Sequence, residues 1–388
     1  MYFFHRLVKY AHHLFQLSKI KTNLLFVNYL SSPYFVNSFN YVQDEYGHPE
    51  LRIERTRFRF WIYPSYWRYF LNRALDIGGA RHRNKVCRNQ TVHCITSVAP
   101  GAGIGHQLAC WNTALIFSLR YNLNFVHHPL HSSGNDNWEN FLEFGEGELS
   151  HCSVVGDNSV KIVNLPRIWR IDREDIDGHR IFERIVESER LNASRKILFQ
   201  LNSDHFAYDQ TVTSEVLRKK YWNARAKNPI DSVYREDKLN IACHVRRGDI
   251  VREKTKEQDF ENLENRWLDN MYFINVINNI NEILNEHTVD IHVFSQGSIA
   301  EFSEFEELKN VTYHLDLDAC LTFHHMATSN ILILSPSSFS YKAGMISTGI
   351  KIARYPWWHE IPEDSEWIRS SKDGNFSPKP LAERYLKL

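Results

Sequence analysis

The residues best suited to chemistry form the motif HVRRGD at positions 244–249, directly after the apolar run LNIAC. The pattern predicts a buried strand at 239–245, and ligands of open parallel sheets bind beyond the carboxyl ends of such strands. Guanidinium groups stay protonated at any working pH and match phosphate oxygens with planar pairs of donors. Neighbouring residues leave a strand in opposite directions, so we expect Arg246 to face an anionic ligand while Arg247 pairs with Asp249 and stiffens the loop. A solvated surface turn is the alternative.

A serine-rich motif, SPSSFS at 335–340, follows the apolar run NILIL and opens a predicted helix. Serines at the start of a helix cap it, and the N–H groups of the first turn form an anion site with the positive end of the helix dipole. We therefore expect Ser337, Ser338 and Phe339 to hold a phosphate through backbone and hydroxyl groups. A simple N-cap, which needs one serine, is the alternative.

Two further clusters lie where predicted strands end. FSQGS at 294–298 ends a strand at 289–294 and adds Ser295 to the same edge of the sheet. GAGIGHQ at 101–107 forms a strand-to-helix turn in an earlier segment, where Gly103 and Gly105 let the backbone approach a ligand closely. Its spacing matches neither the dinucleotide-binding fingerprint nor the P-loop, and a tight packing turn is the alternative.

The elements that position these motifs alternate between strands and helices in two series. The first series has strands at 92–98, 122–128, 160–165 and 196–202. The second has strands at 239–245, 289–294, 310–315 and 330–335, each followed by a helical pattern. Apolar runs separated by helices favour parallel strands that are covered on both faces. We predict an α/β fold of two doubly wound domains that face one another, at 91–232 and 233–388, after an aromatic and basic extension at 1–90.

Composition excludes several classes of function. The 388 residues include 46 Lys and Arg against 46 Asp and Glu, so the chain lacks the positive field on which nonspecific nucleic-acid binding relies. We expect no nucleic-acid partner. The six cysteines include no C-x-x-C pair, which signals neither a zinc ribbon nor a thioredoxin-like site.

The motifs together resemble those of the GDP-fucose-dependent fucosyltransferase superfamily, which includes the α-1,2, core α-1,6 and protein O-fucosyltransferases. HVRRGD resembles the H-x-R-R-G-D motif of that superfamily, and SPSSFSYKAGMIS is similar to the S-S-F-S-W-W-A-A segment of the α-1,2 branch. GAGIGHQLACWNTALIFSLRYNLNF is similar to its N-terminal G-x-L-G-N-Q sequence with the following helix and strand. The likeness covers about 92–130 and 239–350.

The resemblance implies a GT-B-like pair of Rossmann-like domains and an inverting transfer of fucose from GDP-fucose to a glycan hydroxyl. It implies no metal and no cofactor besides this donor substrate. It assigns Arg246, with His244 and Asp249 of the same motif, to catalysis at the diphosphate leaving group. The residues that it assigns to substrate binding are Gly103, Gly105, His106, Arg247, Ser295, Ser337, Ser338 and Phe339.

The chain departs from the family pattern at three places. His106 stands where the family usually has Asn, Gln296 and Gly297 stand where an acidic residue commonly reads guanine, and Tyr341 and Lys342 replace a tryptophan pair. A different nucleotide sugar, or a non-catalytic sugar- or nucleotide-binding protein on the same fold, therefore stays open. A sulfotransferase would need a P-loop-like Lys or Thr after the glycines, which the sequence lacks.

Other titratable residues give weaker signals. A general base for the acceptor hydroxyl has three candidates, which an acidic surface loop would explain equally: Asp136, Glu139 and Glu143. His127, His128 and His131 lack a carboxylate partner at metal-ligand spacing, so we interpret them as satisfied or exposed histidines and predict no metal site.

The first residues bear on the cellular location. No apolar run reaches the length of a membrane span. Residues 1–21 interleave Arg and Lys with Phe, Leu and Tyr at helical spacing, which is typical of a peripheral membrane contact and equally of a helix packed on the protein. We expect a cytoplasmic protein, with contact to a membrane face and a Golgi enzyme without its anchor as open alternatives.

Overall fold

The computed structural model describes residues 40–43, 49–53, 56–58, 93–97, 103–131, 137–165, 176–191, 195–201, 210–248, 250, 266–284, 289–357, 359–362 and 364–385. The chain separates into two compact units, Met1–Leu71 and Asn72–Leu388. In the first unit, β1 (Asn40–Gln43), β2 (Pro49–Ile53) and β3 (Thr56–Phe58) pair as an antiparallel sheet. All other described elements belong to the second unit. The predicted contact of residues 1–21 with a membrane falls outside the described residues.

The N-terminal lobe of the second unit, residues 93–227, contains a parallel sheet in the order β6-β5-β4-β8-β7. Its strands are β4 (His93–Ser97), β5 (Asn124–His127), β6 (Leu149–Ser150), β7 (Lys161–Asn164) and β8 (Ile197–Leu201). Its helices are α5 (Ile104–Tyr121), α6 (Trp138–Leu142), α7 (His151–Val155), α8 (Ile176–Leu191), the 3-10 turn η1 (Thr211–Thr213) and α9 (Ser214–Lys227). The four strands predicted in this lobe are confirmed within two residues.

The C-terminal lobe, residues 239–385, contains a six-stranded parallel sheet in the order β11-β10-β9-β12-β13-β14. Its strands are β9 (Leu239–His244), β10 (Val289–Ser295), β11 (Val311–Leu315), β12 (Ile331–Leu334), β13 (Ile350–Arg354) and β14 (Trp367–Ser370). Its helices are α12 (Asn270–Ile283), η2 (Ile299–Glu307), α13 (Ala319–Thr328), α14 (Ser338–Ile346) and α15 (Lys379–Tyr385). The segment predicted as a helix at 300–308 is the 3-10 helix η2, and the predictions did not include β13, β14 and α15.

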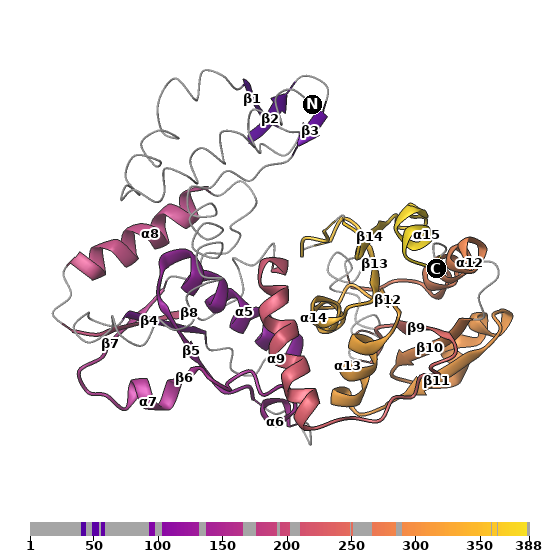
Figure 1. The fold of residues 1–388 in the computed structure, drawn as a ribbon, viewed down its shortest axis with the longest axis horizontal. Helices are drawn as coiled ribbons and strands as arrows, with labels where there is room; N and C mark the ends of the chain where they lie inside the picture. The colour runs from indigo at the N-terminus through magenta and orange to yellow at the C-terminus, as the bar shows by residue number, and fades with distance from the viewer. Residues whose placement is uncertain are drawn as a thin grey trace, which may run out of the picture. The chain divides into compact units, whose positions relative to one another are not determined.

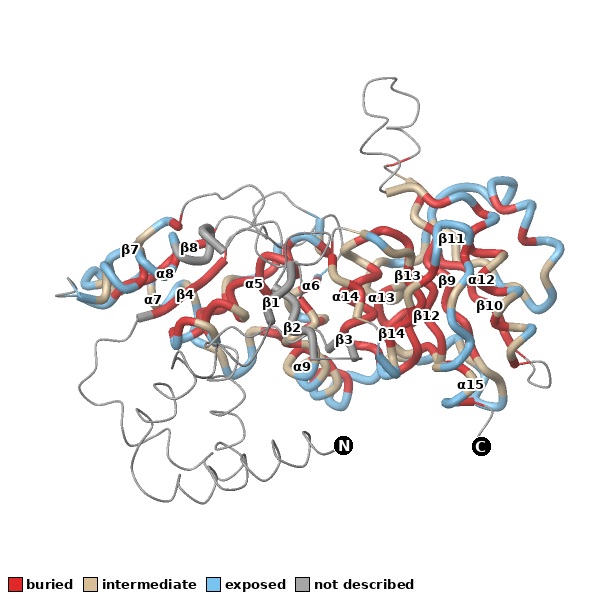
Figure 2. Tube along the Cα trace, turned by 90° about the horizontal axis from the view of Figure 1, so that it is seen from above, coloured by how far each residue is buried: buried red, intermediate tan, exposed pale blue. Residues whose placement is uncertain are grey.

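The central strands of this sheet are apolar throughout because helices cover both of their faces. Ile241 and Ile333 pack on the side of α12, whereas Ala242 and Leu332 pack on the side of α13 and α14. Figure 2 shows the buried residues, in red, running through β9, β12 and β13. The prediction of an α/β fold with parallel sheets is confirmed.

Helices join the two lobes through a common apolar core. Figure 1 shows α5, α9, α13 and α14 between the two sheets. Leu108 of α5, Tyr221 of α9, Phe323 of α13 and Tyr341 of α14 belong to one buried cluster. The boundary between the two domains was predicted near 225–238, and α9 extends to Lys227 at the start of this stretch. The helix buries Leu217, Tyr221 and Ala224 at helical spacing.

A clasp between α9 and the C-terminal lobe adds polar contacts to this core. Arg218 donates to Ile346 O at 3.2 Å and Ser347 O at 2.7 Å, the carbonyls at the end of α14, and pairs with Glu366 at 2.9 Å. A cation at the end of a helix satisfies carbonyls that lack a partner inside the helix and interacts favourably with the dipole. The clasp therefore fixes α14 to the N-terminal lobe.

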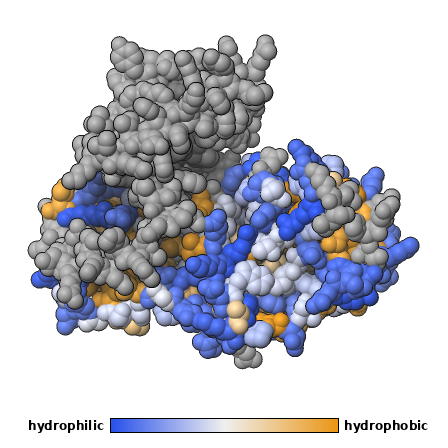
Figure 3. Space-filling view, in the orientation of Figure 1, coloured by the Kyte–Doolittle hydropathy of each residue, from blue (hydrophilic) through white to orange (hydrophobic). Residues whose placement is uncertain are grey.

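Exposed apolar side chains gather on the N-terminal lobe. Those with the largest exposed fractions there are Leu119, Leu149, Val155, Ile162, Ile181 and Leu191. On the face seen in Figure 3, the visible residues of the C-terminal lobe are mainly hydrophilic. Across the described ranges, none of the helices combines the length and the apolar character needed to cross a bilayer.

Buried histidines connect β10, β11 and α13. His292 Nδ1 and His314 Nε2 lie 3.0 Å apart, and the rings of His314 and His325 both stack on Phe294. Burial, with the charge that His314 would carry, lowers the pKa of His292 to about 4 and that of His325 to about 4. Both side chains are therefore neutral in the folded protein at pH 7.

These histidines predict a loss of stability in mild acid. In the unfolded chain they take up protons near pH 6.5, but in the folded chain they do so only near pH 4. The free energy of unfolding that depends on their neutral form is fully present above pH 6.5. It falls as the pH decreases from 6.5 toward 4, by on the order of 1 kcal/mol for each pH unit and each histidine. Urea unfolding at pH 7.5, 6 and 5 measures this slope.

The variant His292→Asn should reduce the slope of stability against pH, whatever it does to stability at pH 7.5. The same substitution at the exposed His131 should leave the slope of the parent protein unchanged. An identical slope in the parent and in His292→Asn would contradict the account.

Candidate functional site

The six-stranded sheet reverses its strand order between β9 and β12. From β9 the chain proceeds to β10 and β11 on one side, and from β12 it proceeds to β13 and β14 on the other. Connections that diverge from neighbouring strands leave a crevice beyond their carboxyl ends, and open α/β sheets bind ligands there. HVRRGD follows β9 and SPSSFS follows β12, so both motifs lie at this crevice.

Ser335 joins the two motifs directly. Its hydroxyl donates to His244 O at 2.6 Å and accepts from Arg246 N at 2.8 Å. Its side chain is buried, so water competes little for these bonds. Sequence reasoning did not select Ser335 among the serines of SPSSFS, because the register that places it opposite β9 is set by the sheet.

The next serines organise the start of α14. Ser337 is the N-cap residue, and its hydroxyl accepts from Phe339 N at 3.3 Å. Ser340 donates to Ser335 O and Ser337 O at 3.1 and 3.2 Å, which closes the turn. The N-terminus of α14 therefore points at the crevice beside Arg246, as an anion site requires.

Ser338 has a partner that the sequence did not indicate. Its hydroxyl lies 3.1 Å from Nε2 of His359, a buried residue of the segment after β13. The ring of His359 stacks on Tyr341 at 4.6 Å between ring centroids. His359 therefore fixes the rotamer of the first residue of α14.

The glycine motif of the N-terminal lobe meets the same helix. A Cβ atom on Gly105 would lie 2.5 Å from Phe339 N and 2.8 Å from Ser338 C. Gly103, the N-cap residue of α5, has nothing within 4 Å of such an atom, and His106 is exposed. The structure thus brings Gly105, Ser338 and Phe339 together, whereas Gly101 lies outside the described residues.

The two arginines of HVRRGD differ in environment, as the alternation predicted. Arg247 is buried and donates to Leu268 O at 3.2 Å and to Asn270 Oδ1 at 2.5 Å, with its guanidinium 3.9 Å from the ring of Trp267. Burial lowers the pKa of Arg247 to about 10, which keeps it charged at pH 7. Through these contacts Arg247 holds the loop after β9 against residues 267–270. Its predicted partner, Asp249, lies outside the described residues.

His244 has one buried ring nitrogen, Nδ1, without a hydrogen-bond partner among the described residues. Its ring is 8% exposed and lies 5.7 Å from the ring of Phe339. Burial and the charges of Arg246 and Arg247 lower the pKa of His244 to about 3, so the ring is neutral. A buried polar atom without a partner costs stability unless a ligand or water satisfies it.

The end of β10 lies next to the end of β9 at the carboxyl edge of the sheet. Ser295 donates its hydroxyl to Val245 O at 2.6 Å, which ties β10 to β9. Gly248 adopts a φ of +72°, and a Cβ there would lie 2.1 Å from Oε1 of Gln296. The positive φ favours glycine at this position of HVRRGD, whereas the exposed Gln296 side chain could move away from a Cβ atom. Gln296 itself is exposed at the end of β10.

The acidic candidates for a general base already have partners. Glu139 accepts from Leu130 N at 2.9 Å and lies 2.8 Å from Nε2 of His127. Burial raises the pKa of Glu139, but these hydrogen bonds outweigh it and the net shift is downward. Glu143 accepts from Asn228 Nδ2 at 2.7 Å. Asp136 lies outside the described residues.

The histidines near β5 are arranged around Glu139. Trp111 Nε1 donates to Nδ1 of His127 at 2.9 Å, so the other nitrogen of the ring carries a proton toward Glu139. His127 is therefore satisfied at both ring nitrogens, as expected from the sequence, and Glu139 is a carboxylate partner that the spacing did not indicate. His128, by contrast, contacts Pro129 O and the ring of His151. Within the described ranges, no three His, Cys, Asp or Glu side chains form a group that could hold a metal ion.

Comparisons with known proteins extend these observations. No family model matches this sequence, and no curated protein matches it. Among solved structures, POFUT1 in complex with GDP is 12% identical, with a TM-score of 0.43 over 67% of this chain and 97% of that chain. The α-1,6-fucosyltransferase NodZ soaked with GDP-fucose, a protein of Bradyrhizobium, is 14% identical, with a TM-score of 0.42 over 66% of this chain and 93% of that chain.

A third similar structure is a variant of Arabidopsis thaliana FUT1 in complex with GDP. It is 11% identical, with a TM-score of 0.41 over 82% of both chains.

The approach of α5 to α14 predicts a specific sensitivity at Gly105. The variant Gly105→Ala places a methyl group against the backbone of Phe339, so we expect the free energy of unfolding to fall by about 1–3 kcal/mol. Alanine has the higher helix propensity, which offsets about 1 kcal/mol of the clash. Urea unfolding followed by tryptophan fluorescence measures the change.

Gly103→Ala provides the matched control, because its added methyl group enters open space. It should lower the free energy of unfolding by less than Gly105→Ala does, by at most about 1 kcal/mol, because alanine is a poorer N-cap residue than glycine. Equal stability of the two variants would show that the two helices separate easily at this point.

Proposed function

We propose that the protein is a glycosyltransferase that uses a nucleoside-diphosphate sugar, with GDP-fucose as the donor. The observation that carries the proposal is the pair of hydrogen bonds from Ser335, which sets Arg246 beside the N-terminus of α14 at the switch crevice. A fixed cation and a helix N-terminus at one point match the negative charge of a diphosphate. The fucosyl donor follows from the resemblance of HVRRGD and SPSSFS to fucosyltransferase motifs.

The reaction would be an inverting displacement at the anomeric carbon of the sugar. The acceptor hydroxyl oxygen forms a bond to that carbon and gives up its proton to water, the bond from carbon to the β-phosphate oxygen breaks, and its electron pair leaves with the diphosphate. Arg246 would stabilise the charge that develops on this leaving group more than the charge of the ground state. His244, neutral and with one unsatisfied nitrogen, would add a hydrogen bond inside the crevice.

The other residues of the site would shape it. Gly103, Gly105 and His106 would approach the donor from the N-terminal lobe, and Ser337, Ser338 and Phe339 would contact it from α14. Arg247 and Ser295 would hold the loops behind the contact residues, since both make their described hydrogen bonds to neighbouring strands and loops. Asp249, the last residue of HVRRGD, belongs to the proposed catalytic motif. The proposed acceptor is a glycan. The proposal includes no metal and no further cofactor.

One observation favours a second candidate for the donor nucleotide. Gln296 stands exposed at the end of β10, where the family pattern has an acidic residue that reads guanine. An amide side chain presents both a donor and an acceptor to a base, so it does not select guanine as a carboxylate does. A different nucleoside diphosphate sugar at the same phosphate site is the alternative.

Ligand-induced thermal protection tests the proposal. GDP and GDP-fucose should raise the unfolding midpoint of the parent protein, since a ligand at 100 times its Kd contributes about 3 kcal/mol. Arg246→Ala should abolish most of this protection, because a charge-assisted hydrogen bond contributes about 2 kcal/mol to binding. Scanning fluorimetry with GDP-fucose, GDP and UDP-glucose measures it.

Arg195→Ala is the control, because Arg195 is an exposed arginine of the N-terminal lobe. It should keep the full protection. Stronger protection by UDP-glucose would move the donor assignment to uridine, and no protection by any of the three would remove the proposed site. Release of GDP from GDP-fucose on addition of a glycan mixture separates an enzyme from a binding protein.

A further inference from the structure

We propose that Arg354 is a second cation for the diphosphate, on the opposite side of Ser335 from Arg246. The inference rests on the proposed function and assigns a residue that the sequence motifs do not contain. Arg354 is the last residue of β13, the strand that pairs with β12 on the side away from β9.

The register of the sheet places Arg246 and Arg354 at the same edge, at or just beyond the carboxyl ends of their strands. Leu334 pairs with Ala353, so Ser335 falls opposite Arg354. On the other side, Ile333 pairs with Cys243, so the same serine falls opposite Val245, one residue before Arg246. The backbone of Ser335 thus lies between the ends of two strands that each supply an arginine.

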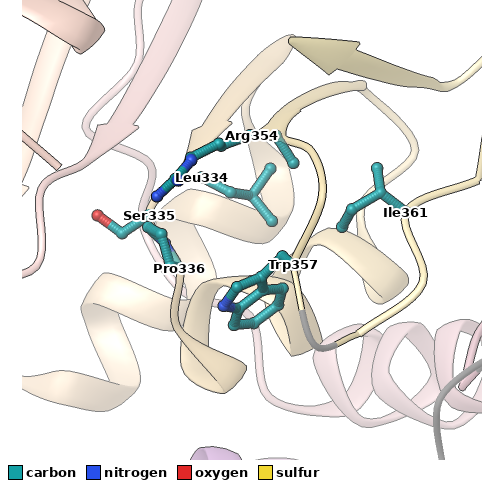
Figure 4. Close-up of a pocket in the computed structure, with 7 residues that line it drawn as sticks. Leu334, Ser335, Pro336, Arg354, Trp357 and Ile361 are labelled. Carbon is teal, nitrogen blue, oxygen red and sulfur yellow. The ribbon is translucent and has the colours of Figure 1, made fainter. Parts of the chain in front are cut away.

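The side chain of Arg354 turns toward this serine. In Figure 4 its guanidinium extends from the end of β13 across the end of β12 toward Ser335. Both residues line a small cavity of about 10 Å³, together with Pro336, Trp357 and Ile361. Among the side chains that line it, the charge is positive and comes from Arg354. An anion that approaches Ser335 from the crevice therefore meets a cation on this side as well.

The strand holds Arg354 more firmly than a loop would. Arg354 pairs with Ser370 of β14, and Tyr355 N donates to Ser370 O at 2.9 Å. The hydroxyl of Ser370 lies 2.6 Å from the hydroxyl of Tyr272 on α12. A cation fixed by strand pairing is pre-organised, so little conformational entropy is lost when it binds.

The segment that follows Arg354 returns to the start of α14. His359 contacts the hydroxyl of Ser338, and Tyr341 donates its hydroxyl to Glu360 O at 2.9 Å. The nearest acid of this segment, Glu360, pairs with Arg369 at 2.7 Å. Residues 359 and 360 therefore contact the start of α14, and Arg354 precedes them beside the proposed phosphate site.

Two cations suit the chemistry better than one. The diphosphate of a nucleotide sugar carries two negative charges, and the departing nucleoside diphosphate gains a further one. A guanidinium on each side of Ser335 would contact the two phosphates separately, with Arg246 on the β9 side and Arg354 on the β13 side. Loss of Arg354 should then weaken diphosphate binding and leave nucleoside binding unchanged.

Calorimetric titration with pyrophosphate, GDP and guanosine tests this assignment, since pyrophosphate reports on the phosphate site whatever base the donor carries. Arg354→Met should weaken binding of pyrophosphate and GDP about tenfold or more, with guanosine unchanged. Arg354→Lys should recover part of this loss. Arg384→Met, in an arginine of α15 that donates to Thr348 O, should bind all three ligands like the parent.

Unchanged affinity for pyrophosphate and GDP in a folded Arg354→Met protein would overturn the inference. If Arg246→Met then still loses the binding of both ligands, the proposed function stands. Should Arg354→Met not fold, the polar and uncharged variant Arg354→Gln decides: affinity for both ligands equal to that of the parent overturns the inference. A parent protein that binds neither pyrophosphate nor any nucleoside diphosphate overturns the proposed function and this assignment together.

Discussion

The structure of the candidate site depends on the hydroxyl of Ser335, which bonds to the carbonyl of His244 and the amide of Arg246. These bonds join two strands at the point where the sheet changes direction, so the loops after both strands have fixed positions. The approach of Gly105 to Phe339 then brings the N-terminal lobe to the same place without room for a side chain. The crevice, the start of α14 and the glycine turn are thus parts of one arrangement.

Charge in the C-terminal lobe is handled in two ways. Buried cations have fixed partners: Arg247 bonds to carbonyl and amide oxygens, and Lys351 pairs with Glu366 at 2.7 Å although burial lowers the pKa of Lys351 to about 8. Such groups stabilise loops and strands, because a buried charge is tolerated only with partners of this kind. Arg246 and Arg354, the two cations of the proposed phosphate site, are only partly buried and lie at or just after strand ends.

Sequence patterns predicted most strands of the two parallel sheets, though not β6, β13 and β14, and the polar motifs that follow several of them. These features are local: an apolar run, a polar cluster after it, and a helix pattern. They missed contacts between distant parts of the chain. Ser335 was one serine among several, and only its position opposite β9 distinguishes it. Arg354 and His359 belong to a segment without motif spacing, and Glu139 meets His127 across a turn. α9 was overlooked because its charges hide the helical spacing of its buried residues.

A crystal structure of the protein soaked with GDP tests the central claim most directly. The account predicts the β-phosphate at the switch crevice, within hydrogen-bond distance of the guanidinium of Arg246 and of the first turn of α14, with the guanine beyond the end of β10. A diphosphate bound at another place, or one at the crevice from which Arg246 turns away, would contradict the account.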